Sequence, residues 1–370
     1  MLMWYIILAI VILMTGGGLL YVSTRLPKFG AIGAWRRNGK DISRRMSVLL
    51  VVVLFALLAL TLNLMNAVVC LVHFAVIWWF CELIFGLIKR VYGANFKHYY
   101  AGWCAIALSI ATLWVGWHLD HHVDATSYTL HSGKNSSALR VVQFADSHIG
   151  TTFDADGFAA HLQKMQQYNP DVLLIVGDFV DDDTSRADML AACEALGQFK
   201  AKHGVYFVFG NHDKGYHDPS VRGFSGDDLI KALRQNGVHV LQDEAELVAG
   251  DFYILGRQDV SEFQRGGNRA DMQTLVKPLD KSKFIMVLDH QPNDYANQAQ
   301  VGVDLVLSGH THGGQLFPLN TVGEWIGVND QTYGFERRGL TDFIVTSGLS
   351  DWAIRFKTGT KSEFVVIDIQ

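Results

Sequence analysis

Four long apolar runs dominate the first part of the chain, and few charges interrupt them. Each run approaches or reaches the roughly 17 to 25 residues that a helix needs to cross a bilayer. The pattern therefore predicts four transmembrane helices, although a buried helical bundle is an alternative. The runs cover residues 2–22, 46–62, 67–88 and 101–118.

The pattern changes after residue 138, where short apolar runs alternate with amphipathic stretches. This alternation is typical of an α/β or α+β domain, here about 230 residues long. We expect a membrane domain at residues 1–120, a linker at 121–138 with its short linker tract at 132–137, and the α/β domain at 139–370. The predicted strands are residues 139–145, 172–176, 205–209, 284–288 and 303–307.

Charge separates the two parts as clearly as hydropathy does. Residues 1–120 hold 10 Lys or Arg and 3 Asp or Glu, out of 31 basic and 36 acidic residues in the whole chain, so the remainder holds 21 and 33. Because an acidic domain repels a polyanion, nucleic acid is not an expected partner.

The basic residues of the first part of the chain, residues 1–120, lie in the loops between the apolar runs. Seven follow the first run and three follow the third, whereas the link at residues 63–66 carries no charge. Since Lys and Arg near span ends favour the cytoplasm, both basic loops are predicted to be cytoplasmic. Four spans then predict a multi-pass protein of the cell membrane, with the large domain on the extracytoplasmic side.

Side chains that can bind metals follow all five predicted strands. Ligands in α/β sheets bind outside the carboxyl ends of the strands, so these side chains form one pool. In the stretch SGHTHGGQLF, for example, His310 and His312 project to one face, and the glycines let the backbone bend sharply. The pool includes Asp146, His148, Asp178, Asp181, Asn211, His212, His290, His310 and His312.

This set of ligands indicates a particular chemistry. Carboxylates, an amide and imidazoles without a thiolate suit Mn, Fe, Zn or Co, and disfavour a structural zinc. The ligands are too many for one ion, whereas two divalent ions about 3.5 to 4 Å apart would use them all, with one carboxylate bridging. Such a pair lowers the pKa of a bound water and clamps the attacking and leaving oxygens at phosphorus, which predicts a phosphoester hydrolase.

The order D-x-H, G-D-x-x-D, G-N-H-D, H, G-H-x-H resembles the calcineurin-like metallophosphoesterases. The fuller GHTHGGQ, with Ser347-Gly348 and Arg355-Phe356 downstream, is similar to their YkuE/YaeI-type membrane-associated branch. The resemblance covers about residues 139–369 and leaves out the four-run front. It implies a sandwich of two mixed sheets flanked by helices, with a dinuclear metal site at the strand ends.

The resemblance also implies which residues bind the metals. One ion would be held by Asp146, His148 and His312, the other by Asn211, His290 and His310, and Asp178 would bridge them.

Two further residues receive catalytic roles from the same resemblance. His212 would donate a proton to the leaving oxygen or hydrogen-bond the phosphate. Asp181 would orient His212, although it could instead cap the helix that follows. Asp182 stands where many relatives of the wider family carry a phosphate-binding Arg, so this chain departs from that pattern.

These inferences combine into a membrane-anchored, dinuclear-metal-dependent phosphoesterase that acts by attack of a metal-bound hydroxide, with lipid-linked esters among its candidate substrates. One alternative is a pyrophosphatase acting on a nucleotide-linked lipid such as UDP-diacylglucosamine, which a cytoplasmic domain would favour. Another is a non-enzymatic membrane scaffold or receptor, which a missing ligand would favour, and none is missing. Monoester, diester and pyrophosphate substrates all stay open, as do the metal and the oligomeric state.

The charge pattern makes a testable prediction about topology. A reporter enzyme that works only when exported is expected to be active when fused at Ser136 and inactive when fused at Gly39, because four spans place these sites on opposite sides of the membrane. Activity in the opposite pattern would place the large domain in the cytoplasm and favour the nucleotide-linked lipid as substrate.

Overall fold

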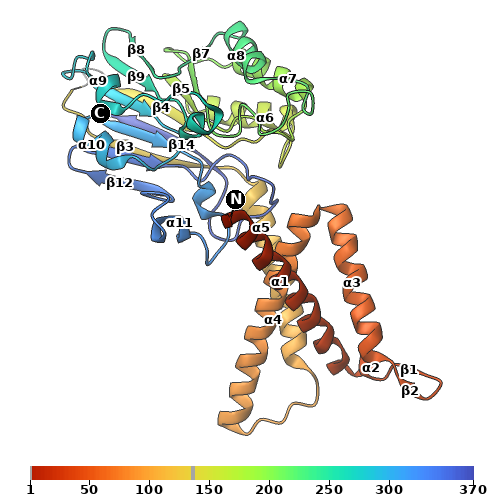
Figure 1. Ribbon diagram of the computed structural model, residues 1–370. Helices are drawn as coiled ribbons and strands as arrows, with labels where there is room; N and C mark the ends of the chain where they lie inside the picture. The colour runs from red at the N-terminus through yellow and green to blue at the C-terminus, as the bar shows by residue number, and fades with distance from the viewer. Residues whose placement is uncertain (1, 135–137) are drawn as a thin grey trace. The chain divides into compact units, whose positions relative to one another are not determined.

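The computed structural model describes residues 2–134 and 138–370, and the chain divides into the units Met1–Gly116 and Trp117–Gln370 (Figure 1). The predicted linker tract at 132–137 therefore lies partly outside the described residues. The unit boundary falls inside a helix, α5 (Tyr100–His121), whose last residues belong to the second unit.

The first unit is helical, and each predicted apolar run forms a helix. In the described residues, four helices are long and apolar enough to cross a membrane: α1, α3, α4 and α5. A break at Leu62 and Asn63 separates α3 from α4, and the Asn63 side chain caps α4 by accepting a hydrogen bond from the Asn66 N–H. The helices and short elements of this unit are α1 (Leu2–Arg25), η1 (Leu26–Lys28), α2 (Gly30–Gly33), β1 (Arg36–Arg37), β2 (Lys40–Asp41), α3 (Ser43–Thr61), α4 (Leu64–Tyr92) and α5.

Most apolar side chains of these helices face outward. Between 11 and 22% of the apolar window of each helix is buried. Leu13, Leu60 and Trp103 are among the exposed apolar side chains. A bundle buried in water-soluble protein would hide such groups, so the exposed flanks favour lipid as their surroundings.

Glu82, a carboxylate within α4, is neutralised by its neighbours. It forms ion pairs with Arg25 at 2.8 Å and Lys28 at 2.5 Å, and accepts hydrogen bonds from the hydroxyls of Tyr21 and Tyr99. A charge in an apolar helix is costly unless it is paired. These contacts give Glu82 a structural role, because they pair its charge within the first unit.

The second unit is built on two six-stranded mixed sheets. Their strand orders are β3-β14-β4-β5-β6-β7 and β12-β13-β11-β10-β9-β8. The first sheet contains β3 (Asp124–Leu130), β4 (Leu139–Phe144), β5 (Val172–Val176), β6 (Val205–Val208), β7 (Val238–Val240) and β14 (Glu363–Ile369). The second contains β8 (Glu244–Val248), β9 (Phe252–Gly256), β10 (Phe284–Leu288), β11 (Leu305–Ser308), β12 (Gly334–Arg338) and β13 (Thr341–Val345).

Helices cover the outer face of each sheet. The first sheet packs against α6 (Ala155–Gln166), α7 (Arg186–Gly197) and α8 (Gly226–Gln235), and the second against α9 (Met272–Val276) and α10 (Tyr295–Val301). The short helices η2 (Val260–Arg265), η3 (His312–Gly314) and α11 (Val322–Trp325) lie in connections. The predicted sandwich of two mixed sheets flanked by helices is confirmed (Figure 1).

A third apolar cluster fills the space between the sheets. Leu174 and Tyr206 of the first sheet share this cluster with Met286 and Leu305 of the second. Within each sheet, β4, β5 and β6, like β9, β10 and β11, are parallel neighbours. Their carboxyl ends therefore meet at one edge of each sheet, which positions the residues that follow them.

The structure corrects one predicted boundary. Residues 121–138, expected to be a linker, contain β3, which pairs in parallel with β14 along seven residues. The strand starts three residues after α5 ends, so a helix long enough to span a membrane continues almost directly into a sheet of the second unit. The sequence pattern concealed β3 because this edge strand, DATSYTL, is mostly polar and shows neither an apolar run nor a regular alternation.

Candidate metal centre

The nine residues of the predicted pool follow five strands at the carboxyl edges of the two sheets. Asp146 and His148 follow β4, Asp178 and Asp181 follow β5, and Asn211 and His212 follow β6, all in the first sheet. The second sheet contributes His290 after β10, and His310 and His312 after β11.

Six of these residues gather in two groups. In each group one ligand atom per residue lies within 4.8 Å of the others. The groups are Asp146, His148 and His312, and Asp178, His290 and His310. Each combines residues from both sheets.

The carboxylate of Asp178 lies between the two groups. Its Oδ2 is 3.0 Å from His290 Nε2 and 3.7 Å from His148 Nε2. Its Oδ1 accepts a hydrogen bond of 2.8 Å from the backbone N–H of His212. One oxygen thus faces an imidazole of each group, which is the arrangement that a bridging carboxylate requires.

The histidine rings are held by one nitrogen and present the other to the site. Nδ1 of His290 is 2.7 Å from Val176 O, and Nδ1 of His312 is 3.1 Å from Ser350 O. Nε2 of His290 faces Asp178 Oδ2 at 3.0 Å, and Nε2 of His148 is buried without a hydrogen-bond partner in the described parts of the chain. Metal-binding histidines are commonly fixed in this way through the second ring nitrogen, so the residues fit a metal.

Five candidate ligands have a left-handed backbone. The φ angles are 53° at Asp146, 35° at His148, 51° at Asp178, 70° at His310 and 49° at His312. Such values are uncommon for residues other than glycine and concentrate at functional sites. These turns aim the side chains back over the strand ends.

Glycines let the ligand loops approach one another. A Cβ at Gly309 would lie 2.5 Å from Asp146 Oδ2, and a Cβ at Gly210 would collide with Asp178 Oδ1. Gly309, which precedes the histidine pair, must therefore be a glycine because the carboxylate of Asp146 leaves no room for a side chain.

Opposite charges are concentrated in the buried site. Burial lowers the pKa of His148, but its hydrogen bond to Asp181 and the charge of Asp178 outweigh burial and raise that pKa to about 9. Burial also raises the pKa of Asp178, yet the charge of His290 holds it well below its ordinary value. The Asp178 carboxylate thus stays ionised and favours a cation beside it.

Asp181 has a different partner from the one expected. Its Oδ2 is 3.1 Å from His148 Nδ1, and its Oδ1 accepts a hydrogen bond from the Asp183 N–H. Helix α7 is capped by Ser185, so the capping alternative for Asp181 is wrong. The contact places Asp181 where it can orient His148, and its role beside His212 stays a prediction.

Asn211 and His212 lie at the more open side of the site. The Asn211 amide NH2 donates to the Tyr216 hydroxyl at 2.8 Å, and its Oδ1 accepts a long hydrogen bond of 3.5 Å from Gln291 Nε2. The His212 ring lies 5.0 Å from His148, 5.0 Å from Tyr216 and 5.4 Å from Trp352, measured between ring centroids. Because Tyr216 and Trp352 are exposed, His212 is flanked by two aromatic rings that a substrate can reach.

Asp213 is a positioning residue to which the sequence analysis gave no role. Its buried carboxylate accepts hydrogen bonds from the N–H groups of Asp178, Phe179, Val180 and Gly210, at 2.7 to 3.1 Å. It therefore ties the loop after β5 to the loop after β6. Its place in the G-N-H-D motif was the only signal in the sequence.

Asp182, which replaces the Arg of many relatives, has a structural partner. Its Oδ2 accepts a hydrogen bond of 2.9 Å from the Tyr216 N–H. The nearby Arg222 is buried and donates to the backbone oxygens of Asp181 and Asp213. Both side chains brace the loop that carries Tyr216.

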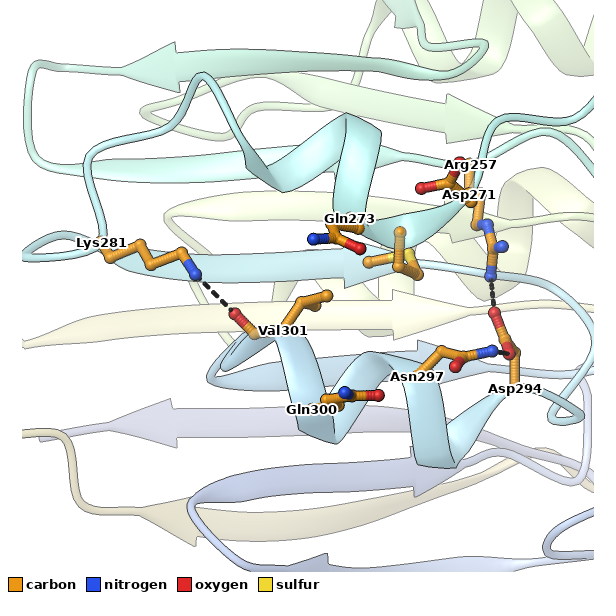
Figure 2. Close-up of a pocket in the computed structure, with 9 residues that line it drawn as sticks. Arg257, Asp271, Gln273, Lys281, Asp294, Asn297, Gln300 and Val301 are labelled. Atoms are coloured by element: carbon orange, nitrogen blue, oxygen red, sulfur yellow. Dashed lines mark hydrogen bonds and ion pairs between the residues drawn. The ribbon is translucent and has the colours of Figure 1, made fainter.

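A separate cavity of about 350 Å³ lies beside α9 and α10 (Figure 2). Arg257 and Asp294 form an ion pair of 2.5 Å there, and Lys281 donates to Val301 O. None of the candidate metal ligands lines it. Arg257 and Asp294 pair with each other, and no group of candidate metal ligands lies here, so the cavity gives no reason to place the functional site away from the strand ends.

The second unit brings metal-ligand side chains from two stacked sheets together around the carboxylate of Asp178. This arrangement is typical of metal-dependent phosphoesterases. Residues 139–314 match the family described as calcineurin-like phosphoesterase. A metallophosphoesterase of Aquifex aeolicus is 30% identical, over 51% of this chain and 70% of that protein. The chain belongs to this family.

Two other relatives have names that concern the apolar helices of the first unit and the membrane-associated branch of the family. A Danio rerio "transmembrane protein with metallophosphoesterase domain" is 31% identical over 62% of this chain and 53% of that protein. The metallophosphoesterase YkuE of Bacillus subtilis is 24% identical over 68% of this chain and 86% of that protein. The chain covers 53 to 60% of the first three curated relatives that it matches. The apolar helices and these names together indicate membrane association.

Asp213→Asn is expected to destabilise the second unit by about 1 to 3 kcal/mol, because an amide NH2 replaces one acceptor oxygen and leaves buried N–H groups unpaired. Thermal unfolding of the full chain in detergent measures this effect. Glu194→Gln, an exposed change on α7, serves as the control. Equal stability of the two variants would show that Asp213 does not hold the loops.

Proposed function

We propose that this chain is a membrane-anchored phosphoesterase that depends on two divalent metal ions. The observation that carries the proposal is the position of Asp178, with one oxygen facing the imidazoles of two separate ligand groups. A site for one metal ion requires only one of these ligand groups, whereas a site for two metal ions requires both groups and a carboxylate that bridges them.

The ligand assignment follows from the groups. Asp146, His148 and His312 would hold one ion, and His290, His310 and Asn211 the other, with Asp178 shared. Asn211 belongs to the assignment because of the resemblance; its amide NH2 donates to Tyr216, and its Oδ1 accepts only a long hydrogen bond of 3.5 Å from Gln291, which a metal would replace. Mn, Fe, Zn and Co all suit this set of ligands. Such ions neutralise charge on phosphoryl oxygens and make water acidic enough to attack phosphorus at neutral pH.

His212 is proposed to act on the leaving oxygen. Burial lowers the pKa of its ring to about 4, so the free protein holds it neutral at pH 7, with one N–H to donate to a phosphate oxygen. The negative charge of a bound phosphoester favours protonation of this ring, which would then give its proton to the leaving group. Tyr216 and Trp352 beside it would contact the leaving group.

The side of the membrane and the substrate belong to the same proposal. The basic loops after the first and third runs support an extracytoplasmic catalytic unit. Only two residues of chain connect α5 to β3, which supports a substrate carried by lipid.

The proposal is tested with the purified full chain, stripped of metal and reloaded with Mn, Fe, Zn or Co. We expect hydrolysis of at least one class in a panel of phosphomonoesters, diesters and pyrophosphates that includes lipids, and no hydrolysis without metal. A chain that binds these esters without cleaving any of them, with any of the metals, would be a receptor instead.

Asp178→Asn is expected to lower the metal content below two ions per chain and to abolish turnover, because a neutral amide cannot offset the repulsion between two cations. Elemental analysis of the purified protein gives the metal content. Asp182→Asn, in the same loop but in neither ligand group, should keep both ions. Two ions and normal activity in the Asp178 variant would exclude its bridging role.

His212→Ala is expected to retain both ions and to reduce the rate by about 10² to 10⁴, the usual range for one acid-base group. Steady-state kinetics and metal content, measured on the same preparation, separate these effects. His217→Ala, an exposed histidine of the same loop, is the matched control. Loss of metal from the His212 variant would make His212 a ligand instead of an acid.

A further inference from the structure

An exposed apolar loop follows the histidine pair. The loop comprises residues 316–328 and includes α11. Five of its apolar side chains are 56 to 77% exposed, and none belongs to the three apolar clusters of the second unit. They are Phe317, Leu319, Trp325, Ile326 and Val328. Water-soluble surfaces rarely gather so many large apolar groups in one short segment.

The backbone of the apolar loop is ordered by hydrogen bonds. The N–H groups of Leu319, Val322 and Ile326 donate to oxygens within the loop, and the N–H of Val328 donates to Gly323 O. At the base, Gln315 O accepts hydrogen bonds from the N–H groups of Thr358 and Gly359. The apolar side chains are therefore presented outward by a folded segment.

The loop contains a single charged side chain, Glu324. Its Oε1 accepts a hydrogen bond from the Thr332 N–H, which directs the carboxylate back to the protein. The outer part of the loop thus offers apolar and aromatic groups without a competing charge, a composition that suits the interfacial region of a bilayer.

The same short segment of chain holds both the apolar loop and the end of α5. Thr358 and Gly359 hold the base of the loop, and three residues further on the Ser362 N–H donates to Leu119 O at 2.8 Å. Four residues of extended chain span at most about 14 Å. The base of the loop therefore lies near the last turn of a helix that is apolar enough to cross a membrane.

We propose that the apolar loop, residues 316–328, inserts into the interfacial region of the bilayer that holds the helices of this chain. The bilayer is the partner that we favour for these side chains, because the base of the loop is linked by a short segment of chain to the end of α5, the last of the apolar helices. Trp and Phe are enriched at membrane interfaces, where an apolar ring meets water and headgroups. This inference stands on exposure and chain connection and does not depend on the proposed hydrolysis.

Photo-crosslinking tests the contact in the full chain, reconstituted in vesicles of phosphatidylcholine and phosphatidylglycerol. p-Benzoylphenylalanine replaces Trp325 in one variant, Phe317 in a second, and Leu340 in the control. Leu340 is 92% exposed and lies in the turn between β12 and β13, at the opposite end of β13 from the candidate site. Mass spectrometry then identifies what each position has captured.

Lipid adducts several-fold more abundant at Trp325 and Phe317 than at Leu340 are the expected result. Crosslinked dimers at the loop positions would overturn the proposal and make the loop an interface between copies. Equal lipid capture at all three positions, or none at any, would also overturn it. Each variant is first checked for thermal unfolding like that of the unaltered chain, so that a misfolded protein is not counted.

One consequence rests on the proposed function. If the loop enters the bilayer beside the metal centre, replacing Trp325 and Ile326 by Ser should lower the hydrolysis of phospholipid in vesicles several-fold. The hydrolysis of a soluble p-nitrophenyl phosphate ester should not change. Equal effects on both substrates would contradict a role in reaching lipid. Absence of hydrolysis of either ester by the unaltered chain would count against the proposed function alone, because the crosslinking result does not require turnover.

Discussion

The packing of one sheet on the other decides whether the candidate metal centre exists. Each ligand group takes residues from both sheets, so neither sheet carries a complete group by itself. The cluster between the sheets, with Tyr206 packed among residues such as Met286, fixes their relative position. A slip by one residue would move a strand end by about 3.3 Å, nearly the expected separation of two ions. The metal centre therefore depends on apolar packing that contains none of its ligands.

The turns that aim the ligands are costly, and the surrounding structure offsets that cost. A residue other than glycine in a sparsely populated backbone region costs roughly 1 to 3 kcal/mol, and Asp146 and Asp178 are two of the five ligands in this state. Asp213 binds the N–H of Asp178 and of the two residues after it, which fixes that turn independently of any metal. Asp146 is fixed differently, by the N–H of His310 from the other sheet. Hydrogen bonds to backbone N–H groups thus fix these two turns without a contribution from a cation.

The sequence predicted those features that a local pattern encodes. Strands such as β5 and β10 are buried along their whole length, so they appear as uninterrupted apolar runs and their carboxyl ends could be found. Strands β3 and β12 expose part of their side chains and depend on a distant partner for their pairing, which no local pattern reveals. The candidate ligands were found from the strand ends, and six of them gather in two groups there. The partner of Asp181 could not be found in this way, because it depends on a turn that points the carboxylate at His148.

The junction of α5 with the second unit relates the membrane helices to the chemistry. The N–H of Asp124, at the start of β3, donates to Ser362 O, and the Ser362 N–H donates to Leu119 O, so the end of the helix is bonded to the chain that leads into β14. A long flexible linker would let a catalytic unit meet soluble substrates far from the bilayer. Two residues between α5 and β3 reach no more than about 10 Å. This short connection is therefore the structural reason for proposing a substrate at the membrane surface, and it supports that proposal independently of the metal ligands.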